Sequence, residues 1–365
     1  MKIINVVGAR PNMMKIAPII NAMQKHDNIE PLLLHTGQHY DQKMSQIFFD
    51  ELGIPKPDIY LGIGSGTHAE QTANVMIAFE KVLLKHRPDV VLVVGDVNST
   101  MACAITATKL HIPVAHVEAG LRSFDRTMPE EINRLMTDAI ADMLLTTSRG
   151  AGVHLQNEGI PTEKIFFVGN VMIDTLTLHR NKAKHLKTPE KFGLKANEYA
   201  LLTLHRPSNV DDKVIFSGIL DALTTIQQDI PILFPAHPRT RKQIEKFGFT
   251  ERLASAPNIH IIEPQGYLAF LDLMMHARMM LTDSGGIQEE TTILGIPCLT
   301  LRANTERPIT ITEGTSQLVG SDPEKILAAA KDVLADDGKS GDIPELWDGH
   351  AADRVVAALI KNFAA

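Results

Sequence analysis

Hydrophobic positions follow two alternating spacings along the first half of the chain. Short, continuous apolar runs such as residues 90–94 are typical of strands that are buried on both faces. Between them, apolar residues recur three or four positions apart, as expected for helices with one buried face. The runs predict strands at 3–7, 31–35, 90–94, 114–117, 143–146 and 165–168 and helices at 13–24, 45–52, 72–84, 100–110, 132–140 and 152–158. Strands that alternate with helices predict a parallel α/β sheet with right-handed crossovers.

The pattern weakens over residues 177–195, a basic and polar segment interrupted by Pro189 and Gly193, which we expect to link two domains. Alternation then resumes, with strands expected at 199–204, 232–234, 260–262, 279–282 and 298–301 and helices at 214–227, 267–277, 286–294, 323–334 and 351–363. The sequence therefore predicts two doubly wound, Rossmann-like α/β domains that face a cleft. They span 1–176 and 196–345, and the C-terminal helix 350–363 is expected to cross back to the first domain.

Composition narrows the class of protein. The 365 residues include 36 Lys and Arg against 43 Asp and Glu, a net charge of −7, so the chain lacks the basic excess of a nucleic-acid-binding protein. The two cysteines, Cys103 and Cys298, lie in apolar stretches without metal-ligand spacing, so we expect buried thiols and no metal site. No apolar run reaches the ~18 residues that span a membrane, and the N-terminus has no secretory h-region. We therefore expect a cytoplasmic protein.

Charged residues follow several predicted strands of the first domain. Arg10 lies in the turn after the first strand, Asp96 directly follows strand 90–94, and Glu118 ends the next strand. Glu130 occupies the first turn of a helix that begins at Pro129. Each has a plain structural alternative: a surface arginine, a loop cap, or a carboxylate that stabilises a helix N-terminus. Together they predict a cluster of carboxylates at one sheet edge, where mutual repulsion can separate their pKa values for acid–base work.

The second domain has features that suit an anion. His205 and His237 each follow a predicted strand, and Ser284-Gly285-Gly286 opens a helix with bare backbone N–H groups. Glu290 lies further along that helix, where its carboxylate could hold a ribose diol. A capped turn without a ligand is the structural alternative. No GxGxxG motif occurs in the required strand–turn–helix context, so no dinucleotide cofactor is expected.

The motifs, taken in order, resemble those of the non-hydrolysing UDP-N-acetylglucosamine 2-epimerase family over nearly the whole chain. The matching stretches are Gly-Ala-Arg-Pro with Lys15, Gly95-Asp96, the HVEAGLR block at 116–122, Pro129-Glu130-Glu131 with Asn133-Arg134, His205-Arg206, the DSGGIQEE block at 283–290 and Thr305-Glu306-Arg307-Pro308. The resemblance implies the GT-B-like architecture of two Rossmann-like domains, a UDP-sugar substrate, no cofactor or metal, and a homodimer.

The resemblance also implies a role for each matching residue. The diphosphate contacts would be Arg10, Ser284, Gly285 and Gly286; Glu290 would hold the ribose, and the backbone at Phe270 would meet the uracil. The catalytic positions would be Lys15, Asp96, Glu118, Glu130 and His205. His237 and Arg307 would line the cleft.

The implied reaction suits these residue types. The C2 hydrogen of the sugar has no neighbouring carbonyl, whereas elimination of UDP makes it acidic and forms a 2-acetamidoglucal. Protonation on the opposite face of C2 and re-addition of UDP give the epimer, so two acid–base groups are needed. Two other readings are a GT-B-type glycosyltransferase, which would not need three carboxylates together, and an inactive nucleotide-sugar sensor.

Several positions depart from the family pattern. Asn12 replaces the glutamate of the usual Arg-Pro-Glu, the loop between Arg122 and Pro129 is shorter, and Pro207 follows His205-Arg206. These departures resemble the branch that includes epimerases for UDP-2,3-diacetamido-glucuronate sugars, an alternative substrate class. Many bacterial members bind an activating second substrate through Gln-His-Arg, but here Gln38-His39-Tyr40-Asp41 adds an anion, so we expect hyperbolic kinetics without an activator.

Overall fold

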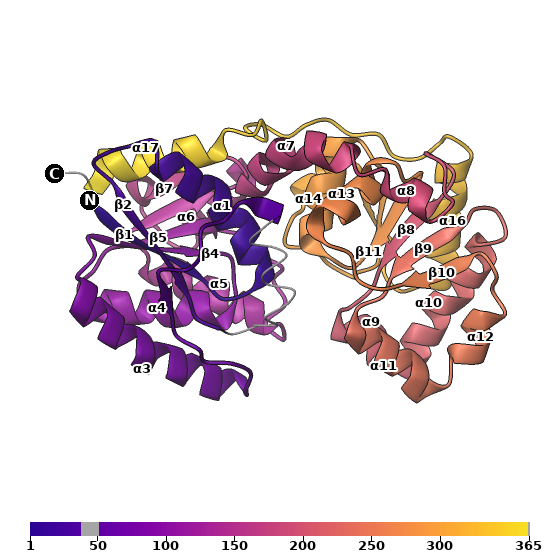
Figure 1. Ribbon diagram of the computed structural model, residues 1–365, viewed down its shortest axis with the longest axis horizontal. Coiled ribbons are helices and arrows are strands. Elements are labelled where there is room, and N and C mark those ends of the chain that lie inside the picture. The colour runs from indigo at the N-terminus through magenta and orange to yellow at the C-terminus, as the bar shows by residue number, and fades with distance from the viewer. Residues whose placement is uncertain (38–50, 364–365) are drawn as a thin grey trace. The chain divides into compact units, whose positions relative to one another are not determined.

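Two α/β units make up the structure, a computed structural model that describes residues 1–37 and 51–363 (Figure 1). The first unit comprises Met1–Leu178 with Glu345–Ala365, and the second comprises His179–Pro344. Each unit has its own parallel sheet and its own hydrophobic core. The predicted fold class, two doubly wound Rossmann-like domains, is confirmed.

The sheet of the first unit has seven parallel strands in the order β3-β2-β1-β4-β5-β6-β7. The strands are β1 (Lys2–Val7), β2 (Glu30–His35), β3 (Ile59–Tyr60), β4 (Val90–Val94), β5 (Val114–Ala119), β6 (Met143–Thr146) and β7 (Ile165–Phe167). The order reverses between β1 and β4. In doubly wound sheets, ligands bind beyond the carboxyl ends of the strands at such a reversal.

Helices of the first unit connect these strands and cover the sheet. They are α1 (Arg10–Met23), α3 (His68–His86), α4 (Asn98–Lys109), α5 (Pro129–Ile140), α6 (Arg149–Asn157), the first part of α7 (Val171–Lys184) and α17 (Ala351–Phe363), with a short 3-10 turn, η1 (Thr162–Lys164). The C-terminal α17 packs against α1 (Figure 1). Asp174 of α7 fixes the start of α17, because its carboxylate accepts hydrogen bonds from the backbone N–H groups of Ala351 and Ala352.

The second unit repeats the same strand order with six parallel strands, β10-β9-β8-β11-β12-β13. Its strands are β8 (Ala200–Thr203), β9 (Ile232–Pro235), β10 (Ile259–Ile262), β11 (Met279–Thr282), β12 (Cys298–Thr300) and β13 (Ser316–Leu318). Its helices, besides the end of α7, are α8 (Thr188–Lys191), α9 (Pro207–Val210), α10 (Lys213–Ile226), α11 (Pro238–Phe247), α12 (Thr250–Ala254), α13 (Tyr267–Met275), α14 (Gly285–Leu294), α15 (Ile309–Thr312) and α16 (Pro323–Leu334). Here the order reverses between β8 and β11.

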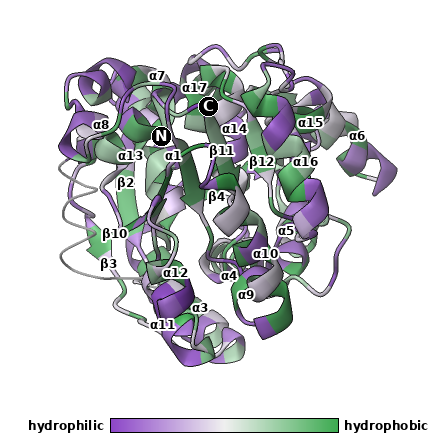
Figure 2. Ribbon diagram, turned by 90° about the vertical axis from the view of Figure 1, so that its right-hand side faces the viewer, coloured by the Kyte–Doolittle hydropathy of each residue, from purple (hydrophilic) through white to green (hydrophobic). Residues whose placement is uncertain are grey.

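The hydrophobic pattern explains why these segments become strands and helices. β4 is buried at all five positions, whereas α3 buries only the face that contains Gln71, Val75, Phe79 and Leu83. Figure 2 shows the same contrast: β4 and β11 are mainly hydrophobic, whereas α3 and α11 carry many hydrophilic positions. Removing these apolar side chains from water is the main favourable contribution to folding of each unit.

The strands and helices expected from the sequence are present, with ends that shift by a few residues. The short edge strands β3 and β13 were not predicted, because runs of two or three residues show no periodicity. The segment 177–195, expected to be a linker, is partly helical: α7 continues to Lys184, and the boundary between the units falls inside it. The predicted helix 45–52 lies mostly outside the described residues. Within 1–37 and 51–363, no helix has the length and apolar character to cross a bilayer.

Candidate active site

The predicted site residues follow strands that flank the reversal of strand order in each unit. In the first unit, Arg10 begins α1 after β1, and Asp96 follows β4. In the second unit, His205 follows β8, and Ser284 follows β11. These loops lie at the carboxyl ends of the parallel strands, which is the ligand-binding edge of doubly wound sheets.

Glu118 has an unusual backbone conformation on β5. Its φ is +72°, in the left-handed region that a residue with a side chain rarely adopts, and the register with β6 shifts between Val117 and Ala119. The carboxylate of Glu118 forms an ion pair with Lys15 Nζ of α1, and both side chains are less than 10% exposed. The irregular strand turns a buried carboxylate toward α1. Backbone strain of this kind is concentrated at functional sites in proteins.

Gly95 lies directly against the Lys15–Glu118 pair. A Cβ atom at Gly95 would be 3.4 Å from both Glu118 Oε2 and Lys15 Nζ, and its φ of +71° is one that glycine adopts readily. Asn12 braces the same place: its Nδ2 donates to the carbonyl of Val94 at 3.0 Å, and its Oδ1 accepts from the backbone of the Gly8–Ala9 turn. The turn after β1 and the turn after β4 are therefore tied together.

Asp96 is held by α5. Arg134 Nη1 donates to the Asp96 carboxylate, and Asn133 Nδ2 donates to the Asp96 backbone carbonyl at 2.8 Å. The Asp96 side chain is 29% exposed, whereas Arg134 is buried. Arg134 is itself bound by Glu131, which also accepts hydrogen bonds from the backbone of Ser123. Burial raises the pKa of Glu131, but the hydrogen bond from Ser123 and the Arg134 guanidinium hold that pKa below its ordinary value.

Glu130 is placed differently from the other two predicted carboxylates. It is the second residue of α5, one turn before Arg134, and it is exposed. A carboxylate in the first turn of a helix is stabilised by the helix dipole whether or not it has a catalytic task. The structure thus places Glu130 beside the helix turn that holds Asp96, at the same edge of the sheet.

His205 is oriented by a buried aspartate. Its Nδ1 lies 2.8 Å from Asp283 Oδ1, and the Asp283 side chain is fully buried. Asp283 also accepts hydrogen bonds from the backbone N–H groups of His205 and Arg206 and from Asn209 Nδ2. Burial raises the pKa of Asp283, but these bonds, above all that from His205, hold the pKa below its ordinary value. With Nδ1 bonded to Asp283, His205 Nε2 is the ring atom left to contact a ligand.

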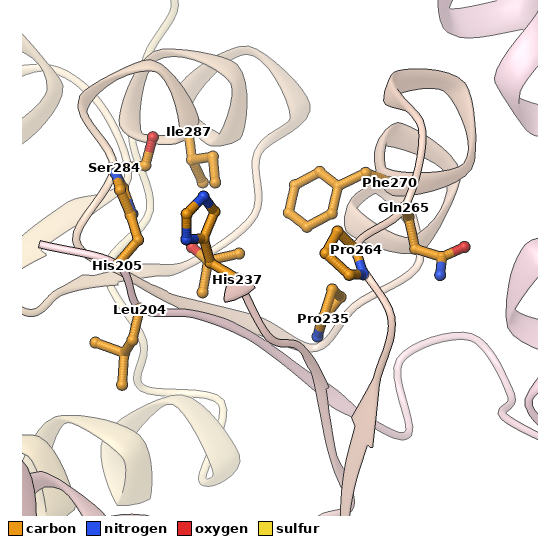
Figure 3. Close-up of a pocket in the computed structure, with 10 residues that line it drawn as sticks. Leu204, His205, Pro235, His237, Pro264, Gln265, Phe270, Ser284 and Ile287 are labelled. Atoms are coloured by element: carbon orange, nitrogen blue, oxygen red, sulfur yellow. The ribbon is translucent and has the colours of Figure 1, made fainter. Parts of the chain in front are cut away.

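A pocket of about 280 Å³ adjoins His205 (Figure 3). Its lining comprises Thr203, Leu204, His205, Pro235, His237, Pro264, Gln265, Phe270, Ser284 and Ile287. In Figure 3, His205 and Ser284 lie on one side, His237 is central, and the Phe270 ring faces it from the other side. A mainly apolar lining with a few polar groups is typical of a small-molecule site.

The N-terminus of α14 forms one edge of this pocket. Ser284 is the N-cap residue, and its hydroxyl makes no capping hydrogen bond. A Cβ at Gly285 would lie 2.4 Å from Arg307 Nη1, so the guanidinium packs directly against the first turn. Arg307 is buried between Glu289, 2.8 Å away, and Glu306. The Ser284 N–H donates to Thr282 Oγ1 at 3.0 Å, and the Glu306 carboxylate also lies against Gly285. The N–H groups of the first helical turn, Gly285 and Gly286, are therefore the donors that suit an anion such as a diphosphate.

Glu290 lies inside α14 and is 3% exposed. The Tyr267 hydroxyl donates to Glu290 Oε1 at 2.9 Å. Burial raises the pKa of Glu290 to about 7, although the Tyr267 bond opposes the shift. Because this bond is to Oε1, the Glu290 carboxyl group retains acceptor positions on Oε2 for further hydroxyl groups, such as a ribose diol.

The structure brings the predicted residues together in two groups. Lys15 and Glu118 meet beside Gly95 in the first unit, where Asp96 is the next residue and its carboxylate is held by Arg134. His205, His237, Phe270 and Ser284 line the pocket of the second unit. Glu290 and Arg307 do not line that pocket but lie along and behind α14. The activator stretch at 38–41 lies outside the described residues. In the part of the chain that the structure describes, no cluster of three or more His, Cys, Asp or Glu side chains could hold a metal ion.

Sequence reasoning did not single out four residues that orient the site: Asp283, Arg134, Glu131 and Tyr267. The first three stand inside quoted motifs, and Asp283 directly follows β11, which is the position that drew attention to Asp96. Tyr267 carries no such signal, because only the fold places its hydroxyl on Glu290.

Comparison with known proteins identifies the family. A family model described as UDP-N-acetylglucosamine 2-epimerase matches residues 21–360. A Methanocaldococcus jannaschii protein of that name is 45% identical over 364 residues, 98% of this chain and 99% of that protein. Its crystal structure in complex with UDP-N-acetylglucosamine and UDP covers 99% of this chain and 100% of that chain, with a TM-score of 0.92.

Two further relatives mark the breadth of the match. The UDP-2,3-diacetamido-2,3-dideoxy-D-glucuronate 2-epimerase of Pseudomonas aeruginosa is 41% identical over 99% of this chain and 100% of that protein. An Anabaena protein solved in complex with UDP and glucose is 14% identical, covers 100% of this chain and 95% of its own, and has a TM-score of 0.59; it shows the GT-B-like two-domain fold alone. The resemblance seen in the motifs is confirmed: the chain belongs to the UDP-N-acetylglucosamine 2-epimerase family of isomerases.

Proposed function

We propose that the protein interconverts UDP-N-acetylglucosamine and UDP-N-acetylmannosamine by elimination and re-addition of UDP. The observation that carries the proposal is the pairing of two sites: the Lys15–Glu118 pair beside Gly95-Asp96 in the first unit, and a pocket of about 280 Å³ at the N-terminus of α14 in the second. Relatives named for this activity, one solved with UDP-N-acetylglucosamine and UDP, support the substrate.

The second unit would bind UDP. The Ser284 hydroxyl and the N–H groups of Gly285 and Gly286, with Arg10, would hold the diphosphate. Glu290 would hold the ribose hydroxyls, and the backbone at Phe270 would contact the uracil. His205, fixed by Asp283, would direct Nε2 to the diphosphate oxygen that leaves C1, and His237 would line the same site. Fixed donors of this kind stabilise the charge that develops on the leaving group.

The first unit would move the protons. As the bond between C1 and the diphosphate oxygen breaks, its electron pair leaves with UDP, a base removes the C2 proton, and the C2–H electron pair forms the C1–C2 double bond of a 2-acetamidoglucal. Protonation of C2 on its other face and attack of UDP on C1 complete the epimerisation. Glu118, Asp96 and Glu130 would supply the acid–base groups, and Lys15 would orient the Glu118 carboxylate through their ion pair.

A UDP-2,3-diacetamido-glucuronate sugar is the second candidate substrate. The observation in its favour is the 41% identity to the Pseudomonas aeruginosa enzyme named for that sugar, close to the 45% of the Methanocaldococcus jannaschii relative. The two substrates share the 2-acetamido group and UDP, so the same elimination chemistry applies to both. They differ at C3 and C6 of the sugar.

We infer that the protein acts as a homodimer. Ile77 and Leu84 lie seven residues apart on one face of α3 and are 59% and 61% exposed. Large apolar side chains at this spacing form a stripe that a second copy of the chain would cover. Sedimentation of the protein and of an Ile77→Asp, Leu84→Asp variant tests this: the native chain should run as a dimer and the variant as a monomer.

Deuterium incorporation tests the reaction. In deuterated water, the protein should convert UDP-N-acetylglucosamine to UDP-N-acetylmannosamine. Deuterium should enter C2 of both sugars, and proton NMR measures the loss of the C2 proton signal. Turnover that retains the C2 proton would contradict elimination. The same assay with a UDP-2,3-diacetamido-glucuronate sugar ranks the two substrates by kcat/KM.

A further inference from the structure

His116 is fully buried at the centre of β5, and the proposed reaction gives it no task. Its imidazole bridges two separate elements. Nδ1 lies 2.6 Å from Asp138 Oδ1 on α5, and Nε2 lies 2.8 Å from the carbonyl oxygen of Gly95, in the turn after β4. A ring held at both nitrogens in this way has one orientation only.

The two partners determine how many protons the ring carries. A carbonyl oxygen only accepts hydrogen bonds, so Nε2 carries a hydrogen. The other oxygen of Asp138 accepts from both the Arg122 guanidinium and the backbone N–H of Gly120, so the carboxylate is ionised and only accepts. Nδ1 therefore also carries a hydrogen, and His116 is an imidazolium.

Neighbouring charges balance this buried cation. The second oxygen of Asp138 accepts from the backbone of Gly120 at 3.0 Å and from Arg122 Nη1 at 2.7 Å. Arg122 in turn forms two hydrogen bonds with Glu158, of 2.8 and 2.6 Å. Two cations thus face two carboxylates. The Glu158 side chain is 34% exposed, whereas His116, Arg122 and Asp138 are buried, so loss of the Nδ1 proton would leave a negative charge unbalanced among the buried groups.

The bond from Nε2 acts on the centre of the candidate site. Gly95 is held twice by β5, since its N–H donates to the carbonyl of Val117 at 3.1 Å and its carbonyl accepts from His116. The Cα of Gly95 faces the Lys15–Glu118 pair, and Asp96 is the next residue. The orientation of the Gly95–Asp96 peptide group, whose carbonyl His116 holds, therefore sets where Asp96 lies relative to Glu118.

We propose that His116 is a permanent imidazolium that fixes the Gly95–Asp96 turn against Glu118, so that both carboxylates stand where proton transfer at C2 requires them. Its effect on turnover rests on the proposed function. His116 is a positioning residue and not a proton donor, because both of its protons are held in hydrogen bonds. Misplacement of a catalytic group by about 1 Å lowers rates by about 100-fold.

Two substitutions of His116 by amide residues each keep one of its two hydrogen bonds and remove the other. His116→Asn can place an N–H where Nδ1 lies and reach Asp138 but not Gly95, whereas His116→Gln can place one where Nε2 lies and reach Gly95. Both remove the same positive charge, so each controls for the other. We expect His116→Asn to lose about 100-fold in kcat and His116→Gln less than about tenfold. KM and the Kd for UDP should stay within several-fold of the native values in both.

The kcat values of His116→Asn and His116→Gln together decide whether His116 acts by positioning the Gly95–Asp96 turn. Equal loss of kcat in the two variants, or a native kcat in His116→Asn, would overturn positioning through Gly95. A melting temperature for each variant shows whether it is folded. If the native protein itself places no deuterium at C2, the proposed reaction has failed, and that result is distinct from failure of the positioning role.

The protonation state has a test that needs no activity and no variant that must fold. In protein labelled with ¹⁵N-histidine, His116 should give two slowly exchanging ring N–H signals with the shifts of an imidazolium, unchanged between about pH 6 and about pH 9. Asp138, Arg122 and Glu158 are the charged groups of its network, and Lys15 and Glu118 face the same turn. A ring with a single N–H in this range would overturn the proposal.

Discussion

The two units have the same strand order but use the reversal of that order differently. Around Gly95, the first unit gathers charged side chains, and each carboxylate described there has a cation beside it: Glu118 has Lys15, and Asp96 has Arg134. The second unit instead leaves an open pocket with mainly apolar walls beside the N-terminus of α14. Under the proposed function, one fold would provide acid–base groups in one unit and a binding surface in the other.

The largest effect should come from neutralising the carboxylates of the first unit. Glu118→Gln, Asp96→Asn and Glu130→Gln should each reduce kcat by roughly 10²–10⁴-fold, the usual contribution of a positioned acid or base. The Kd for UDP, measured by calorimetry, should change by less than several-fold, because the second unit carries most of the proposed UDP contacts. The exposed Glu163→Gln of η1, in the same unit, is the control. Near-native kcat in all three variants would contradict the division of labour.

Gly285→Ala should mainly weaken UDP binding by the second unit. The added Cβ would lie 2.4 Å from Arg307 Nη1, so the first turn of α14 or the guanidinium must shift, and the Kd for UDP should rise by about 100-fold. Gly150→Ala in α6, where the nearest atom lies 3.9 Å from the added Cβ, is the matched control. An unchanged Kd for UDP in Gly285→Ala would show that the diphosphate does not use this helix terminus.

The buried Glu290 should make the second unit less stable at high pH. Burial raises its pKa from an ordinary 4.5 to about 7, so between these values the folded protein binds a proton that the unfolded chain has released. The contribution of Glu290 to the free energy of unfolding should therefore fall by about 2.5 kcal/mol between about pH 5 and about pH 8.

Urea titrations at both pH values measure this change, and Glu290→Gln should remove most of it. Two slopes remain in that variant. Asp174 of the first unit, whose pKa burial raises to about 6, contributes one of the same sign, and His35, whose pKa burial lowers to about 4, contributes one of opposite sign below about pH 6.5. If the native protein and Glu290→Gln show the same pH dependence, Glu290 is ionised throughout.

Tyr267→Phe should have the smallest effect of the series. It removes one hydrogen bond to the Glu290 carboxylate, worth about 1 kcal/mol, and so should raise the Kd for UDP about fivefold. Because the Tyr267 bond opposes the effect of burial, the pKa of Glu290 should also rise. The kcat should stay near the native value, because Tyr267 is proposed to act only on UDP binding. A large loss of kcat would contradict this and would indicate that Tyr267 takes part in the reaction itself.

Local pattern alone determined much of this protein. The continuous apolar runs at 90–94, 143–146 and 279–282 became β4, β6 and β11 with the same bounds, because a strand buried on both faces has few polar positions. The loops after those strands could be named in advance as the ligand-binding edge, since parallel strands all end on one side of the sheet. Asp96 and Ser284 were found in this way.

Only the tertiary structure decided which groups meet. Lys15 and Glu118 are 103 residues apart, Arg134 and Asp96 are 38 apart, and Tyr267 and Glu290 are 23 apart, so no local spacing announces these pairs. The left-handed backbone of Glu118 is likewise invisible in the sequence, because it arises where β5 loses register with β6. Side-chain partnership depends on the three-dimensional course of strands and helices, and that course is set by packing of the whole unit rather than by its local sequence.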